Sequence, residues 1–304
     1  AGSATKFIIC GDGQIAQLPW STLPTDQEFT TSQNKKITGR LIDQFQFINC
    51  ISLASLDLDK IQQSRIGNRI TVFSNIDFGA ASEQSATKWN PLNPQTEELT
   101  AIENCFSEKS ILKRTGTEAT KTAWESNTSS SLIHFSTHGF YLPSSAKSAA
   151  DGIASRFVQS DNIYRRNPWV SCGLVFAGAN QSGQNSILLG EEIVGRSLAD
   201  TDLVVLATCR SGEGEVFDGE GGYGIQHAFL LAGAKCTIGS YWSVSDQKTG
   251  RLMRHFYGQL AQGLSASDAL HQTQQHFRQE GLGAQHWGAW MVSGQWFVSK
   301  FVSK

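Results

Sequence analysis

From about residue 69 onward, the chain alternates between short apolar runs and longer segments in which apolar residues recur every three or four positions. The first pattern is typical of buried strands and the second of amphipathic helices. Strands and helices that alternate in this way predict an α/β fold with a doubly wound, mostly parallel sheet flanked by helices. The expected strands are ITVFSN, SILKR, SLIHFST, DLVVLAT, CTIGSYW and WGAWMVSG, and the expected helices span residues 94–106, 117–126, 187–196, 221–233, 246–262 and 265–280.

The N-terminal part shows a weaker pattern. Residues 1–68 contain a short apolar run, KFIIC, and further apolar segments that are separated by polar linkers. We interpret them as an N-terminal subdomain, and we place the main α/β domain at residues 69–304. A long stretch rich in serine and glycine, residues 142–184, interrupts the main domain and contains CGLVFAG, which we predict to be a short extra strand.

Two of the predicted strands end at a reactive side chain. SLIHFST leads into His138, and DLVVLAT leads into Cys209 about seventy residues later. Because ligands bind at the carboxyl ends of strands in an open parallel sheet, we expect the imidazole and the thiol in one crevice. A thiol attacks a carbonyl well only as a thiolate, and an adjacent imidazole supplies the base. The sequence therefore predicts the dyad of a cysteine protease.

Composition narrows the class of protein further. The 304 residues include 25 lysines and arginines against 27 aspartates and glutamates, so we expect neither nucleic acid nor a membrane as a partner. No apolar run approaches the roughly 18 residues of a membrane span and no signal-peptide pattern is found, which favours a cytoplasmic protein. Five cysteines have no zinc-site spacing and are interpreted as reduced thiols packed in apolar surroundings: Cys10, Cys50, Cys105, Cys172 and Cys236.

Several segments, in order along the chain, carry a resemblance to a known family: SLIHFSTHGF, LLGEEIVG, DLVVLATCRSGEGE, the stretch from GGYGIQHAF to SASDAL, and HWGAW. They resemble the motif series of CHAT domains, which are caspase-like, clan CD cysteine peptidases often fused to helical repeats. The opening FIICGDGQIAQLPWSTL is similar to the start of that domain. The resemblance implies a caspase-like sheet, a sensor or activating partner, and a role of the kind that bacterial relatives have in defence or regulated cell death.

The chemistry assigns a role to each residue of the predicted dyad. Cys209 is the expected nucleophile and His138 the general acid-base. The backbone N–H groups of Gly139 and Cys209 are the expected donors of the oxyanion hole, since a residue without a Cβ lets the substrate approach closely. The expected activity needs neither a metal nor an organic cofactor.

Asp246 is the residue that bears on specificity. It follows the CTIGSYW strand, where caspase-like peptidases line the pocket for the side chain before the scissile bond, and a similar W-x-V-x-D stretch supplies the pocket's acid in arginine-specific relatives such as separases. A carboxylate there would accept a bidentate bond from a guanidinium. Trp242 is a candidate wall of the pocket, and Ala207 leaves room for the substrate. Alternatively, Asp246 or Ser245 simply caps the following helix.

Two weaker patterns invite other interpretations. His134 lies on the same strand face as His138 by the two-residue alternation of a strand, which suggests a two-histidine metal site or, since no third ligand accompanies them, ordinary strand packing. The glycines of SGEGEVFDGEGGYG suggest a phosphate-binding loop, but their distance from the strand and the acids among them favour an acidic loop beside the cleft.

The sequence thus predicts a cysteine endopeptidase that cleaves a protein substrate after a basic residue, with arginine favoured. The main alternative is a catalytically silent, caspase-like interaction module. Residues 144–167 are expected to gate the cleft and to be a site of self-cleavage, because they are rich in small and polar residues and hold four basic ones. These are Lys147, Arg156, Arg165 and Arg166.

Overall fold

The computed structural model of the chain describes residues 5–11, 13–52, 66–81, 88–92, 96–127, 129–141, 168–181, 185–208, 214–217 and 221–294. Cys209 and the predicted gating segment at 144–167 lie outside these residues. Within the described ranges, no helix combines the length and the apolar composition needed to cross a membrane.

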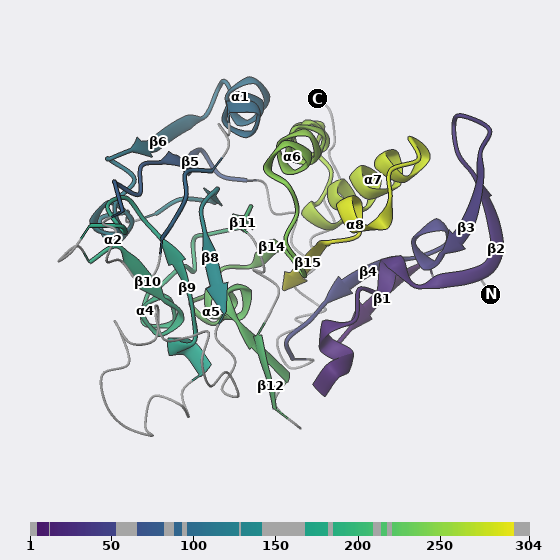
Figure 1. Ribbon diagram of the computed structural model, residues 1–304, viewed down its shortest axis with the longest axis horizontal. Coiled ribbons are helices and arrows are strands. Elements are labelled where there is room, and N and C mark those ends of the chain that lie inside the picture. Colours follow the sequence, from purple (N-terminus) through teal and green to yellow (C-terminus); the bar gives the residue numbers. More distant parts are fainter. Residues whose placement is uncertain are drawn as a thin grey trace.

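An eight-stranded sheet forms the centre of the molecule (Figure 1). Its strands follow the order β1-β4-β15-β14-β11-β7-β5-β6, and only the pair β14 and β15 is antiparallel, which confirms the predicted mostly parallel sheet. The bounds are β1 Lys6–Ile9, β4 Gln46–Asn49, β5 Arg69–Ile76, β6 Ser110–Gly116, β7 Leu132–Phe135, β11 Leu203–Leu206, β14 Cys236–Ser240 and β15 Trp290–Gly294.

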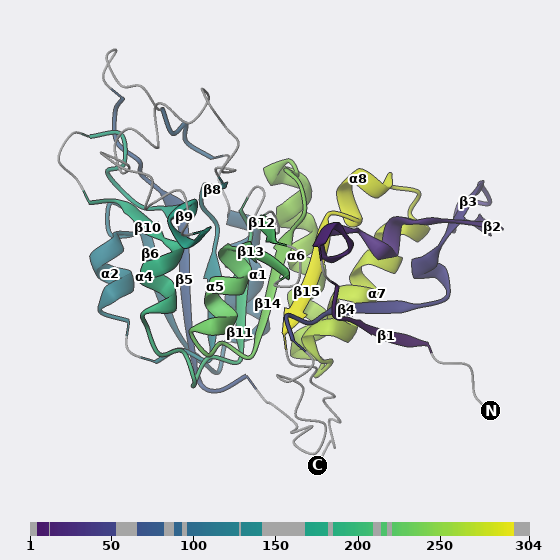
Figure 2. The ribbon, with the colours of Figure 1, turned by 90° about the horizontal axis from the view of Figure 1, so that it is seen from below.

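Helices cover both faces of this sheet, as Figure 2 shows from below. Because side chains alternate along a strand, Val205 of β11 packs with one layer of helices and its neighbour Val204 with the other. Burial on both faces is the reason that these strands are continuous apolar runs. One layer holds α1 Thr96–Cys105, α6 Asp246–Ala261 and α7 Ala266–Gln279, and the other holds α2 Lys121–Glu125, α4 Gly190–Val194 and α5 Ile225–Leu231.

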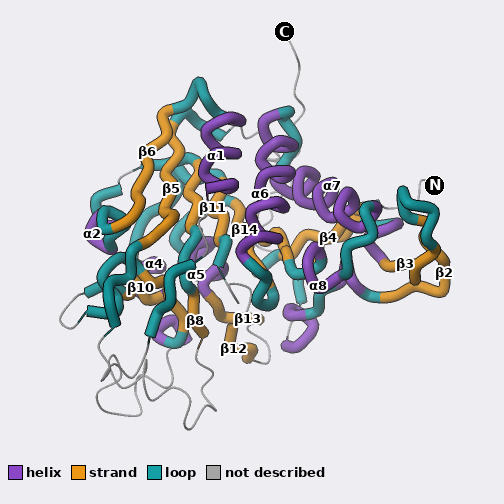
Figure 3. The backbone as a smooth tube through the Cα atoms, turned by 45° about the horizontal axis from the view of Figure 1, so that its top comes forward, coloured by secondary structure: helices purple, strands orange, loops and turns teal. Residues whose placement is uncertain are grey.

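Residues before position 69 contribute two strands to the same sheet. β1 and β4 pair in parallel at its edge, and β4 meets β15 at the pair Asn49 and Ser293. A hairpin of β2 Pro24–Thr30 and β3 Lys36–Arg40 projects at one end of the molecule (Figure 3). The remaining short elements are the 3-10 helices Gly13–Gln17, Trp20–Thr22, Leu41–Asp43 and Pro168–Val170, and α8 Ala284–Trp287.

Two small sheets correct the sequence-based prediction of helices. The predicted helix at 187–196 is wrong in its first three residues, which form β10 and pair antiparallel with β9, so that α4 begins only at Gly190. The predicted helix at 221–233 begins at Ile225, because the residues before it pair with β12. Short apolar or glycine-rich runs fit either structure, and a neighbouring strand decided the outcome. The strands are β8 Gly139–Tyr141, β9 Cys172–Val175, β10 Ile187–Leu189, β12 Gly214–Phe217 and β13 Gly221–Gly224.

Candidate active site

A pocket lies where the strands β7, β11 and β14 end. Ser136 and Thr137 follow β7 directly and line it, as do Ala207 and Thr208 after β11. Its other lining residues include Ser240 at the end of β14. We call this space the edge pocket. The residues that immediately precede His138 and Cys209 in the chain therefore border one pocket, although Cys209 itself lies outside the described residues.

His138 is held from three sides just beyond this pocket. Its ring packs against Phe78 and Trp89, with ring centroids 5.0 and 5.3 Å away. Its Nε2 lies 2.7 Å from the backbone carbonyl oxygen of Asn90. Because a carbonyl oxygen can only accept, Nε2 carries a proton and donates it in this hydrogen bond. Nδ1 is therefore the ring nitrogen that can take up a proton from a neighbouring group.

The backbone around His138 is anchored to β9. The Val175 N–H donates to the His138 carbonyl at 3.0 Å, and the Thr137 hydroxyl donates to the Val175 carbonyl. Gly139, the expected oxyanion-hole donor, is half-buried and starts β8, and its φ is not positive. Its missing Cβ is thus not needed for a left-handed turn.

The loop that packs on His138 is held by Asn180, a residue that sequence reasoning missed. This buried amide accepts from the Trp89 N–H at 2.8 Å and donates to the carbonyls of Trp89 and Gly79, both also at 2.8 Å. Loss of the side chain would free the segment that carries the Asn90 carbonyl. No local pattern marks Asn180 or Asn90, because their partners are distant in the sequence.

The chain before Cys209 is equally well anchored. The Ala207 N–H donates to the Phe135 carbonyl at 2.8 Å, and the Ser240 hydroxyl donates to the Thr208 carbonyl at 3.0 Å. Buried cysteines elsewhere are poor nucleophiles, because burial raises the pKa of Cys172 and of Cys236 to about 12. Cys10 is exposed, contrary to the expectation that all five remaining cysteines are packed.

Asp246 lines the edge pocket. It is the first residue of α6, and Ser245, in the N-cap position, makes no side-chain capping hydrogen bond. Trp242 lies elsewhere: its indole N–H donates to the Gln285 carbonyl at 2.9 Å, and its side chain is not part of the pocket lining. Trp290 of β15, which sequence analysis did not single out, supplies an aromatic wall instead.

His134 is a fully buried residue at the centre of a polar network. Its Nε2 lies 2.9 Å from Oε2 of Glu98, and its Nδ1 lies 2.8 Å from the hydroxyl of Tyr257. Burial first, and then the charges of Glu98 and Cys105, raise the pKa of Tyr257 well above its usual value, so this hydroxyl keeps its proton. Among the described residues, no three His, Cys, Asp or Glu side chains form a cluster suited to a metal ion.

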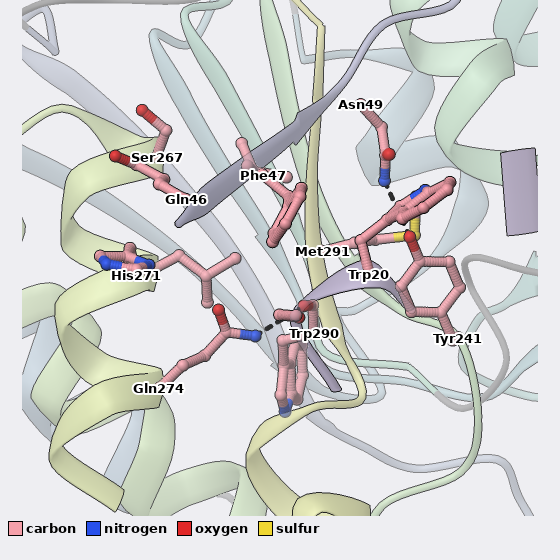
Figure 4. A pocket seen from close by; sticks show the side chains of 13 residues that line it. Trp20, Gln46, Phe47, Asn49, Tyr241, Ser267, His271, Gln274, Trp290 and Met291 are labelled. Carbon is pink, nitrogen blue, oxygen red and sulfur yellow. Dashed lines mark hydrogen bonds between the residues drawn. The ribbon is translucent and has the colours of Figure 1, made fainter. Parts of the chain in front are cut away.

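A second pocket lies between α7 and the strands β4 and β15 (Figure 4). It is lined by aromatic residues such as Trp20 and Phe47 and by polar ones such as His271 and Gln274. Gln274 donates from Nε2 to the carbonyls of Trp287 and Trp290, at 3.0 and 2.8 Å. Trp290 belongs to the lining of both pockets, so the two pockets adjoin the same residue of β15.

Comparisons with known proteins identify a family and similar solved structures. The model of one protein family, the CHAT domain, matches residues 1–295. A search of curated proteins finds no match. Two crystal structures of the Saccharomyces cerevisiae separase–securin complex match with TM-scores of 0.54 and 0.53 and 12% sequence identity. The matches cover 95% and 96% of this chain but only 15% and 16% of the separase chain.

The Arg-specific cysteine proteinase gingipain R matches at a TM-score of 0.48 and 12% identity, over 82% of this chain and 54% of its own. The separase structures share the arrangement of the mostly parallel sheet and its flanking helices, which is the caspase-like fold of clan CD cysteine proteases. The family match extends over nearly the whole chain. The chain therefore belongs to the CHAT domain family and has a caspase-like fold.

Proposed function

We propose that this chain is a cysteine endopeptidase in which Cys209 and His138 form the catalytic dyad. The observation that carries the proposal is that Thr137 and Thr208, each one residue before a member of the dyad, line the same pocket. The His138 ring supports it as well, because its Nε2 proton is engaged by the Asn90 carbonyl and Nδ1 remains available as the base.

The reaction follows from these positions. His138 accepts the thiol proton at Nδ1, and the Cys209 thiolate attacks the substrate's carbonyl carbon to form a carbon–sulfur bond. The developing oxyanion is bound by the backbone N–H groups of Gly139 and Cys209, each worth about 3 kcal/mol in the transition state. The C–N bond then breaks as His138 returns the proton to the leaving amine, and water releases the acyl group in the second half-reaction.

We further propose that the edge pocket receives a basic side chain, preferably arginine, from a protein substrate. Asp246 supports this because it lines the pocket and carries the charge opposite to a guanidinium. The small side chain of Ala207, which also lines the pocket, leaves room for a long side chain. Control by a sensor or activating partner belongs to the same proposal, and so does the self-cleavage expected in residues 144–167.

The experiment combines peptide cleavage with covalent labelling. Cys209→Ala and His138→Ala should each abolish cleavage of fluorogenic peptides, because the dyad acts as a unit and single losses are as severe as a double loss. Labelling by an arginyl ketone that reacts with thiols should disappear with Cys209→Ala. Cys10→Ala, which removes an exposed cysteine, is the matched control and should behave as the wild type. Undiminished cleavage by either dyad variant would contradict the assignment.

A further inference from the structure

The edge pocket holds a second carboxylate besides Asp246. Glu98 lies in the first turn of α1, and its side chain lines the pocket. α1 packs directly against α6, the helix that Asp246 begins (Figure 1). Two acids thus reach one pocket from two neighbouring helices. Each stands in a first helical turn, where the N-terminal end of the helix dipole stabilises a negative charge.

The hydrogen bonds behind Glu98 come from uncharged groups. The hydroxyl of Tyr257 is buried and needs an acceptor for its proton, and His134 Nδ1 lies 2.8 Å from it. An acceptor Nδ1 makes the imidazole neutral, so that the single ring proton sits on Nε2 and is donated to Oε2 of Glu98 at 2.9 Å. Glu98 then accepts one hydrogen bond from a neutral partner and not from a cation.

A negative charge on Glu98 has no paired cation within the described part of the chain. Glu98 is only 1% exposed, and no lysine or arginine among the described residues forms an ion pair with it. Taking a carboxylate out of water without a cation is unfavourable, and a cation that enters the pocket offsets that cost. The site is therefore best suited to a positively charged group.

The rest of the lining matches the hydrogen-bond donors of a guanidinium group. Ser136 Oγ and Thr208 Oγ1 are buried, line the pocket and have no hydrogen-bond partner among the described residues. A hydroxyl oxygen can accept from a guanidinium, which presents five N–H donors in one plane. Trp290 also lines the pocket, and an aromatic ring can stack on a guanidinium plane.

We propose that Glu98 is a specificity-determining residue of the edge pocket and that, together with Asp246, it selects a guanidinium over an ammonium group. This inference rests on the proposed function in one respect: the bound group is taken to be the substrate side chain that precedes the scissile bond. A planar fork with five donors can engage two carboxylates and two hydroxyls together, whereas the compact ammonium of lysine cannot. His134 and Tyr257 act through Glu98 and are positioning residues.

A binding measurement tests this without requiring cleavage. In a Cys209→Ala background, we would titrate the chain with N-acetyl-arginine amide and with the neutral isostere N-acetyl-citrulline amide, using ligand-observed NMR. Glu98→Gln keeps the shape and the acceptor for His134 but removes the charge. It should weaken binding of the arginine amide about tenfold or more and leave the citrulline amide within about twofold. Glu97→Gln, the same change at the adjacent exposed position of α1, should alter neither.

Glu98→Asp keeps the charge on a shorter side chain and should retain a preference for arginine over citrulline. Thermal unfolding of each variant checks that the fold is intact. If Glu98→Gln misfolds, the affinities of the Glu98→Asp variant for arginine, lysine and citrulline amides test the inference on their own. The inference is overturned if the chain binds arginine no more tightly than citrulline, or if Glu98→Gln binds arginine as tightly as its parent.

The two proposals fail in different ways. A wild type that binds the arginine amide through Glu98 but cuts no peptide, with or without a partner, refutes the peptidase and leaves the pocket assignment standing. A wild type that cuts arginine peptides equally well with Glu98→Gln refutes the role of Glu98. The peptidase assignment survives that second outcome.

Discussion

Arg278 and Glu98 are both almost completely buried charged side chains, but their charges are compensated to opposite degrees. Arg278 of α7 is 2% exposed and contacts both carboxylate oxygens of Asp43, and it also donates to the Thr38 carbonyl at 2.9 Å. Glu98 is 1% exposed and accepts from one neutral imidazole. A buried charge whose partners are complete ties elements together, in this case α7 to the N-terminal residues. A buried charge whose partners are incomplete lies at a pocket, where a ligand can complete them.

The largest effect is expected from breaking the complete pair. Arg278→Met should lower the free energy of unfolding by about 3–5 kcal/mol, because it leaves the carboxylate of Asp43, whose side chain is only 13% exposed, without its cation. Chemical denaturation measures the change. Adding Asp43→Leu should recover a large part of the loss, since no charge then remains to be compensated. A loss below about 1 kcal/mol for the single variant would show that Asp43 reaches water.

A smaller effect on stability is expected from Tyr257, whose hydroxyl contacts the imidazole that binds Glu98. Tyr257→Phe leaves Nδ1 of His134 without its donor and should lower the free energy of unfolding by about 1–3 kcal/mol. Because Glu98 loses the orientation of its imidazole partner, selectivity for arginine over citrulline ligands should fall as well. Tyr241→Phe is the matched control: its hydroxyl bonds Asn49 Nδ2 at 2.9 Å, away from the edge pocket, so selectivity should not change. Unchanged selectivity in Tyr257→Phe would make the network purely structural.

His271, a half-buried imidazole in the second pocket, is intermediate in burial between Glu98 and a charge in water. Burial is the main cause that lowers its pKa below 6.5, with Asp268 opposing the shift and Lys6 adding to it. The unfolded chain therefore binds the proton more tightly, so stability should fall as the pH drops through the region below about 6.5. His271→Gln should flatten this dependence in melting curves recorded between about pH 5 and 7. His255, whose pKa burial also lowers, contributes with the same sign and should keep some slope in place.

The smallest effect is expected where the charges are in water. Lys36 and Glu28 form an ion pair across the β2–β3 hairpin at 2.8 Å, with side chains 71% and 67% exposed. Solvent already compensates both charges, so Lys36→Ala should change the free energy of unfolding by about 0–1 kcal/mol. Denaturation at low and high salt checks this. A loss as large as that of Arg278→Met would show that the exposure of a charged side chain does not predict how much its ion pair contributes to stability.

Much of the fold could be predicted from the sequence, because apolar residues recur along each main strand or helix with the spacing typical of that element. The strands around Val72, Ile133 and Val205 are continuous apolar runs, and the helices predicted at 246–262 and 265–280 agree with α6 and α7 within a residue or two at each end. Prediction failed at Ile187–Leu189, where a run of only three apolar residues becomes a strand because β9 offers a partner. The exposure of Cys10 was also missed, since an apolar neighbourhood in the sequence does not ensure burial.

The candidate site was predictable in a similar, partial way. Two strands that end next to each other in a parallel sheet must bring their following residues together, and the edge pocket confirms this for Thr137 and Thr208. The supporting residues were not predictable. Asn90, Asn180 and Glu98 lie in unremarkable local sequence, and their partners are between about 36 and 101 positions away.

The sequence by itself therefore determined the order of the main strands and helices, the membership in the CHAT family, and the positions of His138 and Asp246 relative to strand ends, because neighbouring residues encode these features. Only the tertiary structure decided which nitrogen of His138 faces a carbonyl, that Trp290 rather than Trp242 lines the edge pocket, and that Glu98 joins Asp246 there. These contacts arise where separate helices and strands pack against one another. The spacing of apolar residues in a single segment does not predict such packing, since the packing depends on the shape of the whole core.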